Sequence, residues 1–431
     1  MEFSDTIDST CQAKMSSNGE LVAGMEGQLL VIRNTQTAED VQAFQIELPV
    51  RELKWSPDSE LVMCINVKSM TIDVRSVSDP EWKCTISEGY NHICDAVWGP
   101  DSRCIVSISK ADLRGTVWSL VSMDAICEIP CPRHGAKGIS FRSDGSYAAV
   151  ASRKSGRDLV TIYDTVSWKG TASFDPLTKD LAGLSWSPDG HCLAVWDSRM
   201  EYFLGLFTAN GILLNRYTAY RNALGVVAVE WSALGEMIAV ASCDGFVRIL
   251  ATATWRVLCE FEHTEKVVNT VTFKEAFIYV DEGDPRIGYN ASDGVNVIAL
   301  RDEQNKNKRT STVVREITKL EWNSKGTYMA CVDSTYPNVV QIWDIRGRQQ
   351  AAVIVQRSPI ADLKWDVSGD RLGLCTANSY LYSWRPEGAS CISLPLDDFS
   401  CRRLDFSWNG DCIMLQDRNM YTLGYDITAS G

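Results

Sequence analysis

The sequence is short of positive charge and of long apolar runs. Its 431 residues carry 42 Lys and Arg against 55 Asp and Glu, which gives a formal net charge of −13. Because nucleic acids and anionic membranes bind clustered positive charge, this balance disfavours both as partners. No run approaches the roughly 18 apolar residues of a membrane-spanning helix, and the acidic start Met1-Glu-Phe-Ser-Asp5 lacks the apolar segment of a secretory signal. We therefore expect neither a membrane span nor secretion.

Motifs of nucleotide and acyl-transfer chemistry are also missing. The sequence contains no Gly-x-x-x-x-Gly-Lys loop, no Gly-x-Gly-x-x-Gly fingerprint and no Gly-x-Ser-x-Gly elbow. Cys127, Cys131 and His134 lie close together, but a zinc site usually takes four ligands and the fourth is missing. The 15 cysteines are an odd number scattered within apolar runs, a pattern that favours reduced, buried thiols in a cytoplasmic protein. We expect no catalytic residue, no metal and no cofactor.

What the chain does have is a repeat of about 43 residues. In its clearest copy, residues 184–196, an apolar alternation ends at Trp186, Ser-Pro-Asp-Gly forms a turn, and a second apolar alternation follows. The aligned aromatic recurs at Trp55, Trp98, Phe141, Trp186, Trp231, Trp322, Trp365 and Phe406, with a weaker copy at Met15. Nine copies are therefore visible.

A tenth copy is predicted between two widely spaced members of this series. Trp231 and Trp322 are 91 residues apart, which is about twice the period. A second marker, a Trp followed by Lys or Arg, precedes the next aligned aromatic by 16 or 18 residues. Counting 18 residues on from Trp255 reaches Phe273. We expect a degenerate repeat there, with residues 274–276 in place of its turn.

Each repeat contains about four runs rich in Val, Ile, Trp and Tyr, separated by Gly, Asp and Ser turns. Four-stranded sheets arranged radially form a β-propeller, which leaves only short, protected edges. We expect an all-β propeller of about nine or ten repeats, closed by pairing between the N-terminal strand at 2–7 and the C-terminal strand at 421–425. Because propellers usually have about 4–8 blades, two smaller propellers are the alternative. The even period favours one domain over 1–431, with a possible join at 264–312.

The third strand of one repeat ends in Trp343-Asp344, and another ends in the variant Tyr163-Asp164. Together with the Trp-Ser-Pro-Asp turns, these dipeptides resemble the WD-repeat family of β-propellers. The family usually adds a Gly-His dipeptide whose His joins an Asp in a hydrogen-bond network. This chain has only four His, so most blades cannot build that network. Asp244-Gly245 is its best preserved corner.

A narrower resemblance comes from an ordered set of segments at 79–84, 180–190, 193–197, 201–202, 217–220, 244–249, 337–338 and 343–344. This set is similar to the centrosomal and spindle-pole members of the WD-repeat family. The resemblance implies a non-catalytic scaffold of the cytoplasm and cytoskeleton, located at the centrosome, spindle pole or basal body. It also implies a role in anchoring microtubule minus ends and in cilium biogenesis. The implied partners are a coiled-coil spindle-anchoring protein and, as a further candidate, a minus-end-directed kinesin-14.

Residues 198–222 are the best candidate for a partner-binding surface. The candidate residues are Arg199, Tyr202, Tyr217, Tyr220 and Arg221. Tyrosine and arginine together are enriched in the hot spots of protein interfaces. The structural alternative is that the tyrosines pack onto neighbouring blades. A second recognition segment is predicted at 264–312, where residues 281–284 and 305–309 are expected to form surface loops.

Two recurring residue types have structural interpretations. The carboxylates at Asp58, Asp101, Asp144 and Asp189 occupy one position of the turn, where an Asp accepts local backbone N–H groups. The aligned tryptophans are expected to form the core between blades. The alternative functions are a WD-repeat adaptor in ubiquitin ligation, translation or RNA processing, and a propeller enzyme with its site in a central channel.

Overall fold

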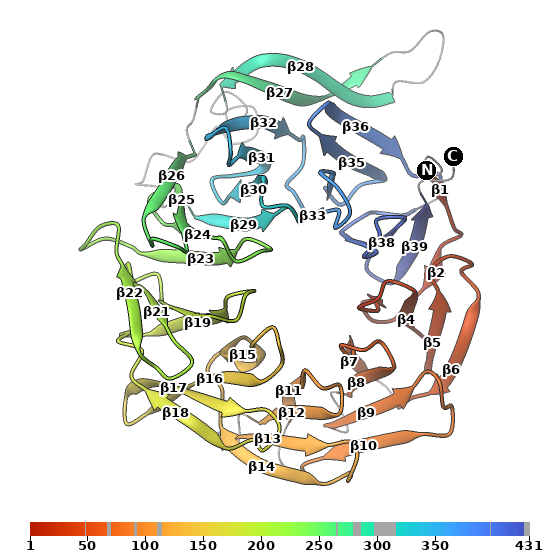
Figure 1. Ribbon diagram of the computed structural model, residues 1–431. Coiled ribbons are helices and arrows are strands. Elements are labelled where there is room, and N and C mark those ends of the chain that lie inside the picture. The colour runs from red at the N-terminus through yellow and green to blue at the C-terminus, as the bar shows by residue number, and fades with distance from the viewer. Residues whose placement is uncertain are drawn as a thin grey trace, which may run out of the picture. The chain divides into compact units, whose positions relative to one another are not determined.

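The structure is almost entirely β. The computed structural model describes residues 1–47, 49–66, 70–89, 93–109, 114–263, 266–278, 286–296, 316–396 and 398–425. Within these residues there is one short 3₁₀ helix, η1 (Gly135–Gly138), and the strands form nine sheets whose neighbouring strands are joined mainly by antiparallel pairing (Figure 1). The all-β fold predicted from the sequence is confirmed, as is the blade of four antiparallel strands.

The chain packs as two compact units. The N-terminal unit comprises Thr6–Arg221 and Arg418–Leu423, and the C-terminal unit comprises Met1–Asp5, Asn222–Asp417 and Gly424–Gly431. The prediction of one domain over 1–431 stays a prediction. Residues 264–265, 279–285 and 297–312 of its proposed join lie outside the described residues, and with them the surface loops predicted at 281–284 and 305–309.

Five four-stranded sheets make up most of the N-terminal unit. Their strands are β3 (Lys14–Met15), β4 (Leu21–Glu26), β5 (Leu29–Asn34) and β6 (Asp40–Gln45); β7 (Val50–Trp55), β8 (Leu61–Asn66), β9 (Thr71–Ser76) and β10 (Lys83–Ser87); β11 (Ile93–Trp98), β12 (Cys104–Ser109), β13 (Arg114–Ser119) and β14 (Ala125–Pro130); β15 (Ile139–Phe141), β16 (Tyr147–Lys154), β17 (Arg157–Asp164) and β18 (Gly170–Phe174); and β19 (Leu181–Trp186), β20 (Leu193–Asp197), β21 (Leu204–Phe207) and β22 (Leu213–Tyr217).

The C-terminal unit contains three further complete sheets. Their strands are β23 (Val226–Trp231), β24 (Met237–Ser242), β25 (Phe246–Ala251) and β26 (Val257–Glu262); β29 (Ile317–Trp322), β30 (Tyr328–Asp333), β31 (Tyr336–Asp344) and β32 (Gln349–Val355), joined by β27 (Lys266–Ile278) and β28 (Arg286–Asn296); and β33 (Asp362–Trp365), β34 (Leu372–Cys375), β35 (Tyr380–Arg385) and β36 (Gly388–Ser393).

The ninth sheet pairs the two ends of the chain. It contains β37 (Arg403–Phe406), β38 (Cys412–Gln416) and β39 (Met420–Tyr425), with β1 (Glu2–Phe3) and β2 (Ile7–Asp8). The register places Phe3 opposite Gly424 and Ile7 opposite Tyr421, both antiparallel. The predicted pairing of the N- and C-terminal strands is thus confirmed.

The predicted tenth repeat is wrong. Phe273 lies inside the 13-residue strand β27, which pairs antiparallel with β28 and parallel with β32, where Phe273 faces Ile354. Residues 274–276 carry no Gly or Pro that would turn the chain, and they continue the strand. Glu275 is buried and accepts a hydrogen bond from the Tyr382 hydroxyl at 3.0 Å. The segment therefore adds a hairpin to an existing sheet and forms no four-stranded blade within the described residues.

The first strand of every sheet ends at the aligned residue of the repeat. This residue is buried at Trp55, Trp98, Trp186, Trp365 and Phe406. Of these, Trp55, Trp98 and Trp365 each donate the indole N–H to a backbone carbonyl on the preceding sheet's first strand. Trp231 and Trp322 are only half-buried, which corrects the expectation that all six tryptophans belong to the core.

Candidate functional site

The structure brings the three candidate tyrosines together in one cluster of the N-terminal unit. The ring of Tyr202 lies edge-on to Tyr217 at 5.9 Å and to Tyr220 at 4.7 Å between ring centroids. Tyr202 is buried, whereas Tyr217 and Tyr220 are half-buried. The tyrosines therefore pack on one another, as the structural alternative anticipated, while two of them keep one side on the surface.

The two candidate arginines lie beside this cluster in sequence, and both are exposed. Arg199 lies in the segment after β20, and Arg221 follows Tyr220. Exposed apolar side chains accompany them at Met200, Ile212, Leu213 and Leu214. Aromatic, basic and apolar groups are thus combined on and around the edge strand β22, and the assignment of these five residues to partner binding stays a prediction.

The repeated turn carboxylates are structural, as predicted. Asp58 accepts the Ser56 hydroxyl and the Glu60 N–H, and Asp189 accepts the Ser187 hydroxyl and the His191 N–H. Asp101 and Asp144 bind turn N–H groups in the same way. Local hydrogen bonds that favour the charged form, outweighing the cost of burial, lower the pKa of Asp189 below its ordinary value. Each of these carboxylates is thus held by hydrogen bonds within the turn that carries it.

The sulfur and imidazole groups at 127–134 are each held by a different part of the chain. Cys127 Sγ contacts the Trp168 carbonyl at 3.9 Å, and a His134 ring nitrogen lies 2.9 Å from the Leu181 carbonyl. In the described part of the chain, no group of three or more His, Cys, Asp or Glu side chains is arranged to hold a metal.

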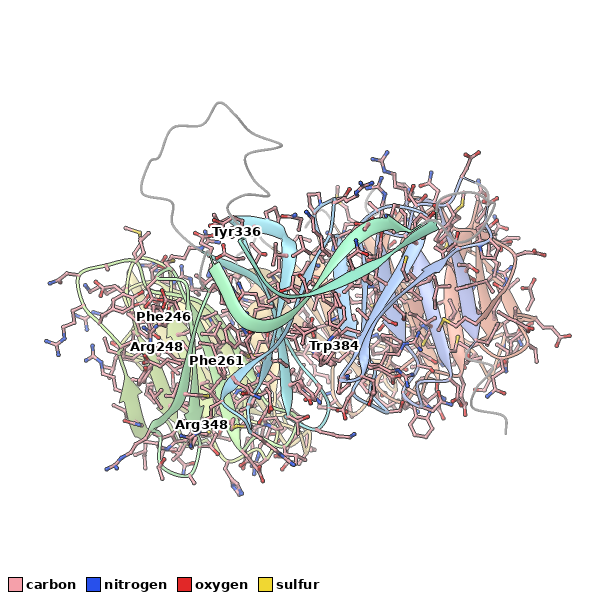
Figure 2. The ribbon with its side chains drawn as sticks, turned by 90° about the horizontal axis from the view of Figure 1, so that it is seen from above. Phe246, Arg248, Phe261, Tyr336, Arg348 and Trp384 are labelled. Atoms are coloured by element: carbon pink, nitrogen blue, oxygen red, sulfur yellow. The ribbon has the colours of Figure 1, made fainter. Side chains whose placement is uncertain are left out.

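The Asp244 corner uses arginine in the place of histidine. Arg248 on β25 donates to Asp244 Oδ2 at 2.7 Å, and Asp244 Oδ1 accepts the Ser242 hydroxyl. The guanidinium also lies 5.0 Å from the ring centroid of Phe246, which Figure 2 labels next to it. This corner is a local ion-pair network, so it supports the blade without the family's usual His–Asp pairing.

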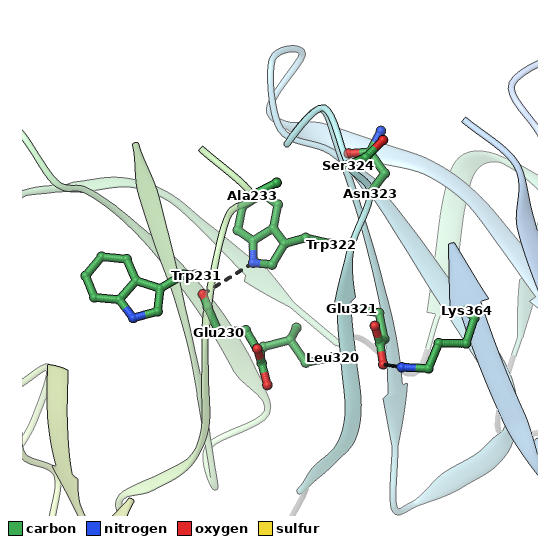
Figure 3. Close-up of a pocket in the computed structure, with 9 residues that line it drawn as sticks. All are labelled: Glu230, Trp231, Ala233, Leu320, Glu321, Trp322, Asn323, Ser324 and Lys364. Carbon is green, nitrogen blue, oxygen red and sulfur yellow. Dashed lines mark hydrogen bonds and ion pairs between the residues drawn. The ribbon is translucent and has the colours of Figure 1, made fainter. Parts of the chain in front are cut away.

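A cavity of about 370 Å³ opens between β23 and β29 of the C-terminal unit (Figure 3). Its walls include the half-buried rings of Trp231 and Trp322 and the side chains of Glu230, Glu321 and Lys364. The Trp322 indole N–H donates to the Glu230 backbone carbonyl at 3.3 Å, which joins the two strands. The ring of Trp231 packs edge-on against that of Trp255, with 6.5 Å between the ring centroids.

The charges in this cavity are unevenly paired. Lys364 Nζ lies 2.7 Å from Glu321 Oε1, whereas no basic side chain of the described residues forms an ion pair with Glu230. Desolvation by the surrounding protein, followed by repulsion from Glu321, raises the pKa of Glu230 from an ordinary 4.5 to about 7. Because the Glu230 side chain still reaches solvent, a ligand can approach this carboxylate.

Sequence reasoning missed the two carboxylates of this cavity, although a signal was present. Glu230 and Glu321 each stand immediately before an aligned tryptophan. Since β23 and β29 belong to consecutive sheets, equal positions in the repeat place both side chains in the wall of one cavity. The equivalent residues elsewhere include Lys54, Ser185 and Lys364. Two consecutive sheets that both carry an acidic residue at this position are therefore particular to β23 and β29.

Repeated four-stranded antiparallel sheets, each beginning with a strand that ends at an aligned and usually aromatic residue, define a WD-repeat β-propeller protein. The chain is 31% identical to mouse WD repeat-containing protein WRAP73 over 98% of this chain and 95% of that protein. It belongs to the WD-repeat family. An uncharacterized WD repeat-containing protein of Schizosaccharomyces pombe is 24% identical over 82% of this chain and 74% of its own length.

Solved structures support the same fold. The chain is similar to a eukaryotic initiation factor (TM-score 0.64, 11% identity, 98% of this chain and 91% of that chain). It is also similar to the Dos1 propeller (TM-score 0.57, 10% identity, 86% and 90%) and to the C-terminal WD40 domain of Sif2 (0.53, 12%, 91% and 98%). At these identities the likeness concerns the fold alone. No protein-family model matches the chain.

One further property of the fold bears on function. None of the described residues forms a helix long and apolar enough to cross a membrane.

Proposed function

We propose that the protein is a non-catalytic scaffold at the centrosome, spindle pole or basal body, where it helps to anchor microtubule minus ends. It acts in a complex with a coiled-coil anchoring protein, and a minus-end-directed kinesin-14 is a further candidate partner. The observation that carries this proposal is the ordered set of segments between 79–84 and 343–344, which resembles WD repeat-containing protein 8, a centrosomal and spindle-pole protein.

Two properties of the molecule support a scaffold. Rigid four-stranded sheets hold exposed side chains in fixed positions, which lowers the entropic cost of binding a partner. The tyrosine cluster of Tyr202, Tyr217 and Tyr220 is ordered by its own ring contacts and borders exposed apolar and basic residues. In contrast, the repeated Asp residues are used in hydrogen bonds within their turns.

The experiment that tests the proposal is localisation of a tagged full-length chain in dividing and ciliated cells, followed by affinity purification. We expect a focus at the poles or the basal body and co-purification of a coiled-coil anchoring protein. A nuclear or ribosomal pattern without such a partner would contradict the proposal and favour an adaptor in another complex.

A double variant identifies the surface that is used. Replacing Tyr220 and Arg221 by Ala should abolish co-purification of the partner, while the free energy of unfolding falls by only about 1 kcal/mol through loss of the Tyr202–Tyr220 ring contact. Replacing the exposed Val166 and Lys169, in the turn between β17 and β18, by Ala provides the matched control.

A further inference from the structure

The cavity at Glu230 combines groups that suit one kind of ligand. It has the Glu230 carboxylate, which forms no ion pair with any other described residue, a second carboxylate at Glu321, and the aromatic ring of Trp322 in its wall. A planar guanidinium satisfies both requirements, because it donates two parallel hydrogen bonds to a carboxylate and stacks on an aromatic face.

We propose that this cavity binds an arginine side chain of a partner polypeptide, with Glu230 as its ion-pair acceptor and Trp322 as the ring it stacks on. The cavity volume of about 370 Å³ is at the lower end of the range for small-ligand sites, and thus suits a single side chain rather than a folded element. This inference goes beyond the scaffold function and holds wherever in the cell the protein works.

Lys364 acts as an internal competitor for the second carboxylate. It lies on β33, at the same repeat position as Glu321 on β29 and Glu230 on β23. Its Nζ atom is 2.7 Å from Glu321 Oε1. Glu321 therefore already has a cationic partner in Lys364, whereas the Glu230 carboxylate remains available to a cationic ligand. An incoming cation therefore completes a row of alternating charges, Glu230, arginine, Glu321 and Lys364.

Binding should be coupled to a proton. Two charged groups of the described residues act on Glu230: Glu321, which raises its pKa, and Lys364, which lowers it. The other residues that line the cavity are uncharged. Near pH 7 a fraction of Glu230 is protonated, and an arriving guanidinium favours the carboxylate, so that the proton is released to solvent. Affinity should then rise as the pH rises through 7.

The test uses the full chain labelled with 5-fluorotryptophan and two probes, N-acetyl-arginine amide and its uncharged counterpart N-acetyl-citrulline amide. The Trp322 fluorine signal is assigned with the Trp322→Phe variant. We expect saturable shifts of this signal with the arginine probe and none with citrulline. The affinity should be about tenfold higher at pH 8 than at pH 6, because ionisation of one group with a pKa near 7 changes by about that factor.

Two substitutions separate the proposal from a structural role of the cavity. Glu230→Gln, which keeps the shape of the side chain, should lower the affinity at pH 8 at least tenfold and remove its pH dependence. Glu236→Gln, at an exposed position of the adjacent turn, should leave both unchanged. Retained affinity and pH dependence in the Glu230→Gln variant, with an unchanged fluorine spectrum of the free protein, would overturn the proposal, as would equal binding of citrulline.

Discussion

We call the contact between the first strands of two consecutive sheets a joint. Two such joints have the same kind of hydrogen bond but differ in the charges of their side chains. In the N-terminal unit, the Lys54 joint (Lys54, Asp95 and Trp98) links β7 and β11; in the C-terminal unit, the Glu230 joint (Glu230, Glu321 and Trp322) links β23 and β29. In both joints an indole N–H donates to a backbone carbonyl on the preceding sheet. Trp98 donates to Lys54 at 3.1 Å, and Trp322 donates to Glu230 at 3.3 Å. The backbone connection is therefore conserved between the two joints.

The side chains of the Lys54 joint have opposite charges and attract, whereas those of the Glu230 joint have like charges and repel. Lys54 Nζ reaches Asp95 Oδ1 at 3.0 Å and the Ala96 carbonyl at 2.8 Å, and Trp98 is buried. At the Glu230 joint two like charges face each other, Trp322 is half-buried, and a cavity remains. These two joints thus keep the same backbone contact, while the residue before the preceding tryptophan differs: Lys54 pairs with Asp95 at one joint, and Glu230 borders a cavity at the other.

The largest expected difference concerns the tryptophans. Trp98→Ala removes a buried ring and should lower the free energy of unfolding by about 3–5 kcal/mol. Trp322→Ala removes a half-buried ring at the border of a cavity and should cost about 1–2 kcal/mol, because less apolar area is lost. Scanning calorimetry measures both, with the exposed Val166→Ala as a control near zero. Equal losses at the two positions would remove this difference between the two joints.

The next effect is on the Lys54 joint itself. Lys54→Met should cost about 1–2 kcal/mol at pH 7, because it removes the ammonium that donates to Asp95 and to the Ala96 carbonyl. Burial alone would raise the pKa of Asp95, but the hydrogen bond and charge of Lys54, with the Ala96 and Ala136 N–H groups, lower it below its ordinary value.

The sign of the pH dependence follows from that shift. Since the folded pKa of Asp95 is depressed, its stabilisation is present above the unfolded value near 4 and is lost as the pH falls through the folded value. The difference between the wild type and Lys54→Met should therefore shrink in acid. Lys83→Met, at an exposed site on β10 of the same sheet, is the control, and an unchanged difference at pH 3 would contradict the assignment.

Much of the fold could be predicted from the sequence because the repeat is periodic. Trp55, Trp98 and Trp365 occupy core positions, and the terminal strands pair, since period and strand pattern determine both. The segment around Phe273 could not be predicted by counting: its strand continues through Glu275, whose burial depends on Tyr382, more than 100 residues away. The cavity was missed for a related reason, because Glu230 and Glu321 become neighbours only when two sheets pack.

A charge reversal should give the Glu230 joint the kind of attraction found at the Lys54 joint. Glu230→Lys places an ammonium beside Glu321, as Lys364 lies beside the same carboxylate from the next sheet. We expect a gain in the free energy of unfolding of about 1 kcal/mol, which is modest because both groups reach solvent, together with loss of arginine binding. Calorimetry and the fluorine titration measure the two effects. A variant that is less stable than the wild type would show that the cavity has another structural cause.

The smallest effect is the most specific to the Glu230 joint. The folded pKa of Glu230, about 7, lies above its unfolded value near 4.5, so the folded state binds more protons between these two pH values. The wild type should therefore lose stability as the pH rises from about 4.5 to 7 and remain constant above. Glu230→Gln lacks this loss, and its advantage over the wild type should grow from near zero at pH 4.5 to about 0.5 kcal/mol at pH 8, reduced by solvent screening. Chemical unfolding at five pH values measures the curve, with Glu236→Gln in parallel. An advantage that is the same at pH 4.5 and pH 8 would mean that burial and repulsion from Glu321 do not disfavour the Glu230 carboxylate in the folded state.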